Sequence, residues 1–183
     1  QNDGGGITGF PETAIHLTSA VATDVDVSWP MIAPTFTTTV SLVPGVTTTV
    51  TLPSSAPANG WIAHLPGEDN AVHAVSTKPF TCRMINNDED SSDAATAIPV
   101  RSLGMDYVLA GYDVSTAVAE DAGIFVVVAA SDGTLVDITP SVDLDGGQLA
   151  GQTFQITLQR GEGYYARASD GDITGTLVEA DAP

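Results

Sequence analysis

One arrangement of strands and turns occurs twice along this chain. The first copy runs from residue 15 to Pro79, and the second runs from residue 125 to Pro183. In each copy, a strand with alternating apolar residues leads into a glycine turn, at Gly45 or Gly161. Another strand comes next, and then a short segment that ends in proline. Because such alternation is typical of strands with one buried face, the repetition predicts a β scaffold made of two similar halves.

The composition indicates an all-β fold. Hydrophobic residues make up 43% of the 183 residues and charged residues only 15%, which is typical of a folded globular protein. Eighteen glycines and eleven prolines indicate many turns. Threonine, which suits pleated surfaces, is concentrated at residues 37–39 and 47–49. We therefore expect an all-β protein, with one or more β-sandwiches built from two pseudo-repeated halves and little or no helix.

The same pattern divides the chain into segments. We expect a flexible lead-in at residues 1–9, a first β pseudo-repeat at 10–86, an acidic connecting segment at 87–122 and a second β pseudo-repeat at 123–183. The two pseudo-repeats are expected to form one compact unit.

The two copies differ after the closing proline. Pro79 leads directly into an apolar strand at residues 80–85, whereas the second copy reaches Pro183 where the corresponding strand would begin. Two interpretations stay open: the chain is a fragment of a longer polypeptide, or a neighbouring chain or domain supplies the strand. A sheet without an edge strand exposes unpaired backbone amides and attracts another strand.

Turn residues predict three hairpins, for example about Pro44-Gly45, which suits a type II turn. The apolar run 124–130 predicts a central strand buried on both faces. Residues 86–97 are acidic and small, so we expect a surface loop there. The expected hairpins pair residues 37–43 with 46–52, 124–130 with 135–139, and 153–158 with 163–168.

The charge of the chain excludes several classes of partner. There are 23 Asp and Glu against 5 Lys and Arg, so the net charge is −18. This field repels phosphate backbones and anionic lipids, and the longest apolar run is too short to cross a bilayer, so neither nucleic acid nor membrane insertion is expected. An acidic, lysine-poor surface favours solubility, cation binding or a basic partner. Because the chain has only five Lys and Arg, trypsin-like proteases have few sites to cut, which suits an extracellular or cell-surface location.

The sequence contains no motif that predicts an enzyme. It lacks a phosphate loop, a dinucleotide fingerprint, a zinc-protease helix and a nucleophile elbow. The histidines, His16, His64 and His73, each lie among strand residues. The single cysteine, Cys82, alternates with apolar neighbours, which predicts a small buried hydrophobe.

Acidic turns provide candidate calcium ligands. Calcium prefers several oxygen ligands, and closely spaced aspartates in loops can supply them. None of the clusters has the EF-hand spacing, and the alternative interpretation is a solvated turn whose carboxylates cap backbone amides. The candidates are Asp88, Asp90 and Asp93 in one loop, Asp143 and Asp145 in a second, and Asp170 and Asp172 in a third.

Aromatic residues allow a further hypothesis of carbohydrate binding. Stacking on sugars would use exposed rings, although packing in the core explains most of these residues. The candidates are Trp29, Trp61, Tyr107, Tyr112, Tyr164 and Tyr165.

Several short motifs, taken in order, resemble the IgGFc-binding family, a domain type of a mucus glycoprotein and of bacterial surface proteins. Each motif is weak alone, but together they cover roughly residues 10–183. They are Lys78-Pro79-Phe80 before Asn86-Asn87, Asp93 before Ala97-Ile98-Pro99-Val100, Leu103-Gly104-Met105-Asp106-Tyr107, the run 125–130 with Asp132-Gly133-Thr134, and Leu158-Gln159-Arg160-Gly161-Glu162 before Asp172-Ile173-Thr174-Gly175-Thr176.

The resemblance implies a non-enzymatic extracellular adhesion or scaffold module of a secreted or cell-surface protein. It brings no catalytic residues, and Asp93 and Asp172 lie in its motifs as candidates for fixing loops. Two alternatives stay open: a structural subunit of an extracellular filament or sheath assembled by strand complementation, and a carbohydrate-binding or carbohydrate-active domain.

Overall fold

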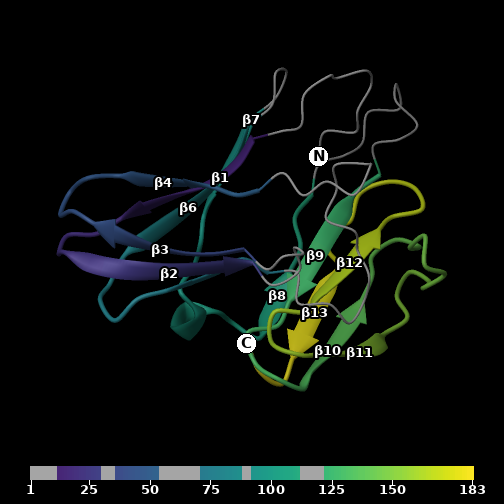
Figure 1. Cartoon of the computed structure of the whole chain (residues 1–183). Coiled ribbons are helices and arrows are strands. Elements are labelled where there is room, and N and C mark those ends of the chain that lie inside the picture. Colours follow the sequence, from purple (N-terminus) through teal and green to yellow (C-terminus); the bar gives the residue numbers. More distant parts are fainter. Residues whose placement is uncertain (1–11, 30–35, 54–70, 88–91, 112–121) are drawn as a thin grey trace. The chain divides into compact units, whose positions relative to one another are not determined.

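The computed structural model describes residues 12–29, 36–53, 71–87, 92–111 and 122–183 (Figure 1). These residues form thirteen strands and one 3-10 turn, η1 (Val100–Ser102), which confirms the all-β prediction. The chain divides into two compact units. The N-terminal unit comprises Gln1–Ala63 and Val72–Ile98, and the C-terminal unit comprises His64–Ala71 and Pro99–Pro183.

The N-terminal unit contains two antiparallel sheets. The first has the order β4-β1-β6-β7, and the second has the order β3-β2-β5. The strands of the first sheet are β4 (Thr48–Thr51), β1 (Glu12–Thr18), β6 (Thr81–Asn87) and β7 (Ser92–Thr96). Those of the second are β3 (Phe36–Leu42), β2 (Thr23–Trp29) and β5 (His73–Val75).

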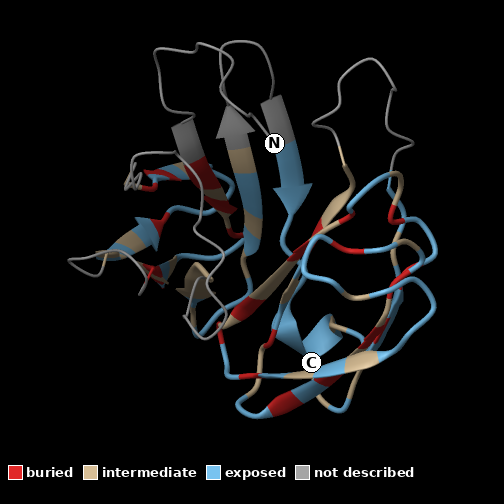
Figure 2. Ribbon diagram, turned by 90° about the vertical axis from the view of Figure 1, so that its right-hand side faces the viewer, coloured by how far each residue is buried: buried red, intermediate tan, exposed pale blue. Residues whose placement is uncertain are grey.

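Both sheets of this unit contribute to one hydrophobic core, which makes it a β-sandwich. Leu17 of β1, Val27 of β2 and Val50 of β4 are buried in the same cluster. Along β2, buried residues alternate with more exposed ones, as a strand with one covered face requires. Figure 2 shows the same alternation of buried and exposed residues along other strands.

The C-terminal unit has the same two-sheet construction. Its larger sheet has the order β11-β10-β13-β8, and its smaller sheet pairs β12 with β9. The strands of the larger sheet are β11 (Phe154–Leu158), β10 (Thr134–Thr139), β13 (Leu177–Ala180) and β8 (Asp106–Val108). Those of the smaller sheet are β12 (Gly163–Arg167) and β9 (Ile124–Val128).

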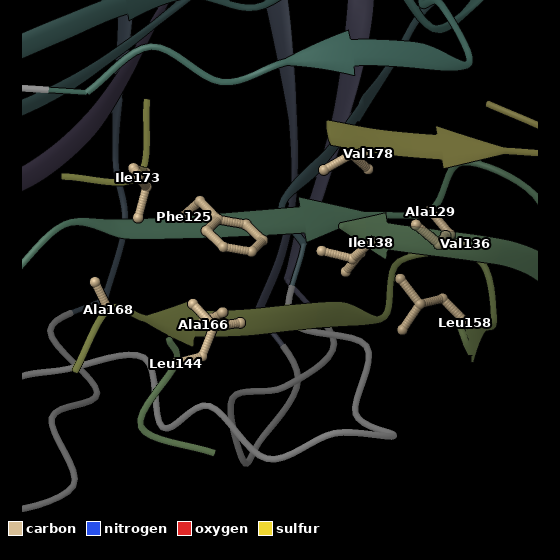
Figure 3. Close-up of a cluster of buried hydrophobic side chains, with 10 residues drawn as sticks. All are labelled: Phe125, Ala129, Val136, Ile138, Leu144, Leu158, Ala166, Ala168, Ile173 and Val178. Carbon is tan, nitrogen blue, oxygen red and sulfur yellow. The ribbon is translucent and has the colours of Figure 1, made fainter. Parts of the chain in front are cut away.

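The core of the C-terminal unit lies between these sheets. Figure 3 shows Phe125 of β9 and Ala166 of β12 gathered with Ile138 of β10 and other buried apolar side chains. Ile138 is 0% exposed and Val136 is 1% exposed, so β10 directs one complete face into the core. The prediction of two sandwich halves therefore agrees with a separate core in each unit.

The strand pairing of the two units is equivalent. The pair β1–β4 corresponds to β9–β12, and the order β3-β2-β5 corresponds to β11-β10-β13. Thr23 of β2 lies opposite Leu42, as Thr134 of β10 lies opposite Leu158. The repeated sequence pattern thus has a repeated topology.

The turn glycines of the two copies make the same hydrogen bond. Gly45 donates its N–H to the Ser19 carbonyl at 2.9 Å, and Gly161 donates to the Ala129 carbonyl at 2.8 Å. Both glycines have positive φ, +73° and +85°, a conformation that L-residues with a side chain rarely adopt. Ser19 and Ala129 are therefore equivalent positions, and this equivalence sets the numbering offset between β1 and β9.

The three predicted hairpins are wrong. In each case the turn exists, but the strands on its two sides belong to different sheets: β3 and β4, β9 and β10, and β11 and β12. The chain therefore passes from one layer of the sandwich to the other at these turns. Turn residues show where the chain reverses, but burial decides which strand accepts its hydrogen bonds.

Two further predictions are corrected. The run 124–130 is not buried on both faces, because Val126 is 54% exposed, and within the described residues β9 pairs with β12 alone. Residues 86–97 are not one loop, because β6 continues to Asn87 and β7 pairs antiparallel with it. Small side chains such as Ala94 and Ala95 are compatible with this exposed edge strand.

The division into two units also differs from the sequence-based segments. The expected connecting segment, residues 87–122, contains β7, which belongs to the N-terminal unit, and η1 and β8, which belong to the C-terminal unit. The expected lead-in, residues 1–9, lies outside the described part of the chain.

Candidate binding groove at the open edge of β9

Strand β9 has one edge in a ladder and one edge without a described partner. Its ladder with β12 runs from Ile124 opposite Arg167 to Val128 opposite Gly163. Beyond the strand ends, Ala168 donates to the Gly123 carbonyl at 2.8 Å, and Ala129 donates to the Glu162 carbonyl at 3.2 Å. Gly123 and Ala129 therefore both direct their backbone groups toward β12.

The direction of the backbone groups along β9 also determines which residues face its other edge. In an antiparallel strand, the backbone groups of successive residues point to opposite edges. Because Gly123 and Ala129 point to β12, the N–H and C=O groups of Ile124, Val126 and Val128 point away from it. Within the described residues, no strand pairs with this second edge, which we call the open edge of β9.

An apolar groove of about 240 Å³ lies beside the open edge. Its lining comes from β9, from β8 with its flanking residues, from β10 and β13, and from the last residues of the chain. The lining residues are Val126, Val127, Val128 and Ala129; Leu103, Gly104, Tyr107 and Leu109; Thr134, Val136, Val178 and Ala180; and Ala182 and Pro183. All of them belong to the C-terminal unit.

Backbone hydrogen bonds hold the β8 segment in this position. Leu109 donates its N–H to the Thr176 carbonyl at 2.9 Å, and Ala180 donates to the Met105 carbonyl at 2.8 Å. The Tyr107 hydroxyl donates to the Gly104 carbonyl at 2.9 Å, which places the ring over its own turn. The β8 side of the groove is therefore built on the ladder between β8 and β13.

The last residues of the chain are fixed beside the open edge. Ala130 donates its N–H to the Pro183 carbonyl at 2.9 Å. Leu135 donates its N–H to Asp181 Oδ1 at 2.8 Å, and Asp181 donates its own N–H to the Leu135 carbonyl at 3.1 Å. Asp181 thus ties this segment to β10, and Pro183 lies close to the chain just beyond β9.

The outer face of the larger sheet carries a row of carboxylates. Asp137 of β10 lies opposite Glu179 of β13, and Glu179 lies opposite Asp106 of β8. Like charges directly across a ladder repel each other. This face of the unit therefore has a negative potential that favours basic over acidic partners.

Two of the acidic candidates cap backbone amides in loops. Asp143 Oδ1 accepts the Ala150 N–H at 2.8 Å, and Asp172 Oδ1 accepts the N–H and the hydroxyl of Thr174, both at 2.9 Å. The Thr174 hydroxyl in turn accepts the N–H of Gly111 at 2.8 Å, so Asp172 links two loops. This arrangement matches the interpretation of these carboxylates as caps for backbone amides.

The other calcium candidates are dispersed. Asp145 Oδ2 lies 3.8 Å from Arg167 Nη1, and Asp170 is exposed. Asp93 lies on β7 opposite Asn86, while Asp88 and Asp90 lie outside the described residues. In the part of the chain that the structure describes, no group of three or more His, Cys, Asp or Glu side chains could hold a metal ion.

The structure places the described histidines and the cysteine on three different strands, β1, β5 and β6. His16 lies on β1 and His73 on β5, in different sheets, and His64 lies outside the described residues. Cys82 packs against the N-terminal core, and burial raises the pKa of its thiol, which disfavours the nucleophilic thiolate.

Two of the aromatic candidates, Trp29 and Tyr164, belong to or pack against the cores. Trp29 is buried in the N-terminal core, and Tyr164 packs against Phe154 with ring centroids 5.8 Å apart. Burial raises the pKa of Tyr164. Tyr107, at 44% exposure, lines the groove. Tyr165 is half-buried on β12, and Trp61 and Tyr112 lie outside the described residues.

The groove itself was not predicted from the sequence. Its signal was the apolar run 124–130, which we interpreted as a strand covered on both faces. In the structure, residues 126–129 of this run line a groove, and its Val126 and Val128 are exposed. The available indication was the uninterrupted apolar run itself.

Comparison with known proteins gives one family. Residues 93–183 match the model of the family described as IgGFc binding protein. The match therefore includes all but the first residue of β7 and the whole of the segment 99–183, with every residue that lines the groove. It is shorter than the range 10–183 expected from the motifs. No curated protein and no solved structure matches the chain.

Proposed function

Because residues 93–183 belong to the IgGFc-binding family, we propose that this protein is a non-enzymatic extracellular module that binds another protein, for adhesion or as a scaffold. The family is one of binding domains rather than enzymes, and its members are typically extracellular. Among the described residues, no helix has the length and hydropathy needed to cross a membrane.

The groove beside the open edge of β9 is the observation that carries the proposal. Apolar surface next to unpaired backbone groups is costly to leave in water and is a common basis of protein recognition. The carboxylate row on the neighbouring sheet face adds a charge preference for the partner. Binding of antibody Fc belongs to the family's description, and we do not assign it to this chain.

The proposal is tested by presenting the purified chain to an array of extracellular proteins and to an array of glycans. We expect saturable binding to at least one protein, and no dependence on glycan. Binding confined to glycans, or release of reducing sugar from them, would replace the proposal with the carbohydrate-directed alternative.

A second candidate function is a structural subunit of a filament or sheath. The open edge of β9 favours it, because an unpaired strand edge can accept a strand from a neighbouring copy. Sedimentation over a wide concentration range distinguishes the two functions. A monomer at all concentrations supports the module, whereas polymers that grow with concentration support the subunit.

Calcium binding is a separate proposal for Asp88, Asp90 and Asp93, of which Asp93 lies on β7 and the other two lie outside the described residues. Carboxylates at this spacing favour it. Calcium at a hundredfold excess over its dissociation constant would stabilise the fold by about 2.7 kcal/mol. Thermal unfolding with calcium and with a chelator measures this effect, and equal melting temperatures would remove the proposal.

A further inference from the structure

We propose that the Arg101–Ser102 peptide bond is a processing site for a trypsin-like extracellular protease, and that its hydrolysis leaves the strands of both units intact. The inference goes beyond the proposed function, because it concerns what is done to the module rather than what the module binds. The chain has five Lys and Arg residues, and all five lie in the described part of the structure. Trypsin-like proteases cleave after such residues, because an aspartate in their specificity pocket pairs with the basic side chain.

Two of the five bonds are protected in the N-terminal unit. Lys78 precedes Pro79, and proline at this position prevents cleavage because its nitrogen carries no N–H and lies in a rigid ring. Arg83 lies in the middle of β6, opposite His16 of β1 and opposite Thr96 of β7. A protease pairs its own backbone with an extended substrate, so Arg83 would first have to leave both ladders.

Two further bonds are protected in the C-terminal unit. The bond after Arg160 leads into Gly161, which is buried and donates its N–H to a backbone carbonyl at 2.8 Å. The bond after Arg167 leads into Ala168, which is 0% exposed and donates its N–H to the Gly123 carbonyl at 2.8 Å. Cleavage at either bond therefore requires this unit to open.

The fifth bond lies in η1 and is open to solvent. Arg101 and Ser102 are both exposed, and η1 contains no buried residue. Two local hydrogen bonds hold this turn: Ser102 donates its N–H to the Pro99 carbonyl at 2.8 Å, and Leu103 donates its N–H to the Val100 carbonyl at 3.1 Å. Unwinding η1 therefore breaks no strand ladder.

The residues that flank η1 already have the backbone shape that a protease binds. Pro99 has φ −57° and ψ 138°, and Leu103 has φ −70° and ψ 146°, so both are extended. Once η1 straightens, Ile98 and Val100 face the same side, because they are two residues apart in an extended chain. They are 63% and 59% exposed, so a protease that binds Arg101 meets two accessible apolar side chains beside it.

The charge around the bond also suits such a protease. Residues 97–105 contain no Asp or Glu, although the chain has 23 of them. A carboxylate beside the bond would be repelled by the aspartate of the specificity pocket and would compete with it for the guanidinium. Arg101 is the one charged residue of this stretch, so its side chain alone determines the local charge.

The bond lies between the strands of the two units along the chain. Strand β7 ends at Thr96, and β8 begins at Asp106. Each described ladder joins strands on the same side of the bond, either among β1–β7 or among β8–β13. Hydrolysis adds water across the amide and gives a carboxylate at Arg101 and an ammonium group at Ser102. The fragment 102–183 keeps β8–β13 and every residue that lines the groove.

The test is limited proteolysis of the complete folded chain with trypsin, followed by measurement of the intact masses of the products. We expect the fragments 1–101 and 102–183 to form before any other product. Cleavage after Arg101 should be about a hundredfold faster, or more, than after the other arginines, because protected bonds are cut only from opened states that a stable fold rarely populates.

Three variants test whether the Arg101 side chain directs the cut. Arg101→Gln should abolish it, because a neutral amide cannot pair with the aspartate of the specificity pocket, whereas Arg101→Lys should retain it. Arg160→Gln is the matched control, because it removes another exposed arginine and should leave the rate of cleavage after Arg101 unchanged.

Amide exchange before and after the cut tests whether the strands stay intact. Val27 of β2 and Ile138 of β10 are 1% and 0% exposed, and each belongs to the core of its own unit. Their slow exchange should persist after cleavage, because no ladder is cut.

Several outcomes would overturn the inference. They are a first cut at another bond, digestion to small peptides without accumulation of the two fragments, and loss of slow exchange once the Arg101–Ser102 bond is cut. Resistance of the folded chain under conditions that cleave the urea-denatured chain would equally reject access to this bond. Cleavage of Arg101→Gln at the original rate would show that the cut lies elsewhere.

Discussion

The N-terminal and C-terminal units share a strand pairing but differ at one edge. In the N-terminal unit, β6 and β7 extend the sheet beyond β1, whereas in the C-terminal unit the described sheet ends at β9. Conversely, β8 extends the C-terminal unit beyond β13, and no described strand extends the N-terminal unit beyond β5. Two units with the same strand pairing can therefore differ in which of their sheets carries additional edge strands.

The side chains on the outer faces differ in the same way. His16 and Thr18 on β1 correspond to Val126 and Val128 on β9. The two valines are 54% and 47% exposed, so β9 presents apolar groups where β1 presents polar ones. An exposed apolar edge strand promotes association. The unit whose described sheet ends at β9 thus also has the more apolar edge strand.

The largest effect is expected from equivalent core leucines. Leu42 and Leu158 are 2% and 3% exposed, and each lies opposite an equivalent threonine. Leu42→Ala and Leu158→Ala should each destabilise its own unit by about 2–5 kcal/mol, because each leaves a cavity. Amide exchange measures this loss unit by unit. A loss that is large in one unit and negligible in the other would contradict the equivalence of the cores.

Proline at equivalent edge positions should separate the two units. His16→Pro removes an N–H that faces β6 and should destabilise the N-terminal unit by about 1–3 kcal/mol. Val126→Pro removes an N–H that faces the open edge, where proline is tolerated, and should cost much less in the C-terminal unit. Urea unfolding compares the two variants. Equal losses would mean that the edge of β9 is covered.

Alanine at the turn glycines should affect both units alike. Gly45 and Gly161 have φ of +73° and +85°. Gly45→Ala and Gly161→Ala should each cost about 1–2 kcal/mol, because a Cβ is strained in this left-handed conformation. Thermal unfolding measures both losses. Gly133→Ala is a control for strain alone. Gly133 also has positive φ, but it does not make the backbone hydrogen bond that Gly45 and Gly161 share.

The smallest effect concerns the carboxylate row. Glu179 lies between Asp137 and Asp106, whereas the equivalent residue in the N-terminal unit is Val75. Glu179→Val makes the two sheets alike and should stabilise the C-terminal unit by about 0.2–1 kcal/mol. The gain should shrink as salt is added, since salt screens the repulsion. A gain that is independent of salt would exclude repulsion as its cause.

Sequence patterns predicted the strands better than their partners. Alternation located β2 and β10, because buried residues alternate with more exposed ones along each of them, and it also located β6. It failed for β9, where an open edge and a groove produce the same apolar run as burial between two layers. It also missed β7, whose small residues lack apolar alternation and which forms an edge against β6.

The candidate site also has some features that the sequence predicted and others that it did not. The acidic turns were visible in the sequence, and the structure shows Asp143 and Asp172 capping backbone amides. The groove was not visible, because its lining joins residues from β8, β9, β10 and β13, which are distant in the sequence. A local pattern contains no information on which distant segments form one cavity.

The repetition, the all-β class, the acidity and the family resemblance depend on the order of residues alone, since each arises from local alternation, turn chemistry or summed charge. Which strands pair, where each turn changes layer and which edge stays open were decided only in three dimensions. The physical reason is that hydrogen bonds between strands and the burial of their apolar faces depend on segments that no local pattern brings together.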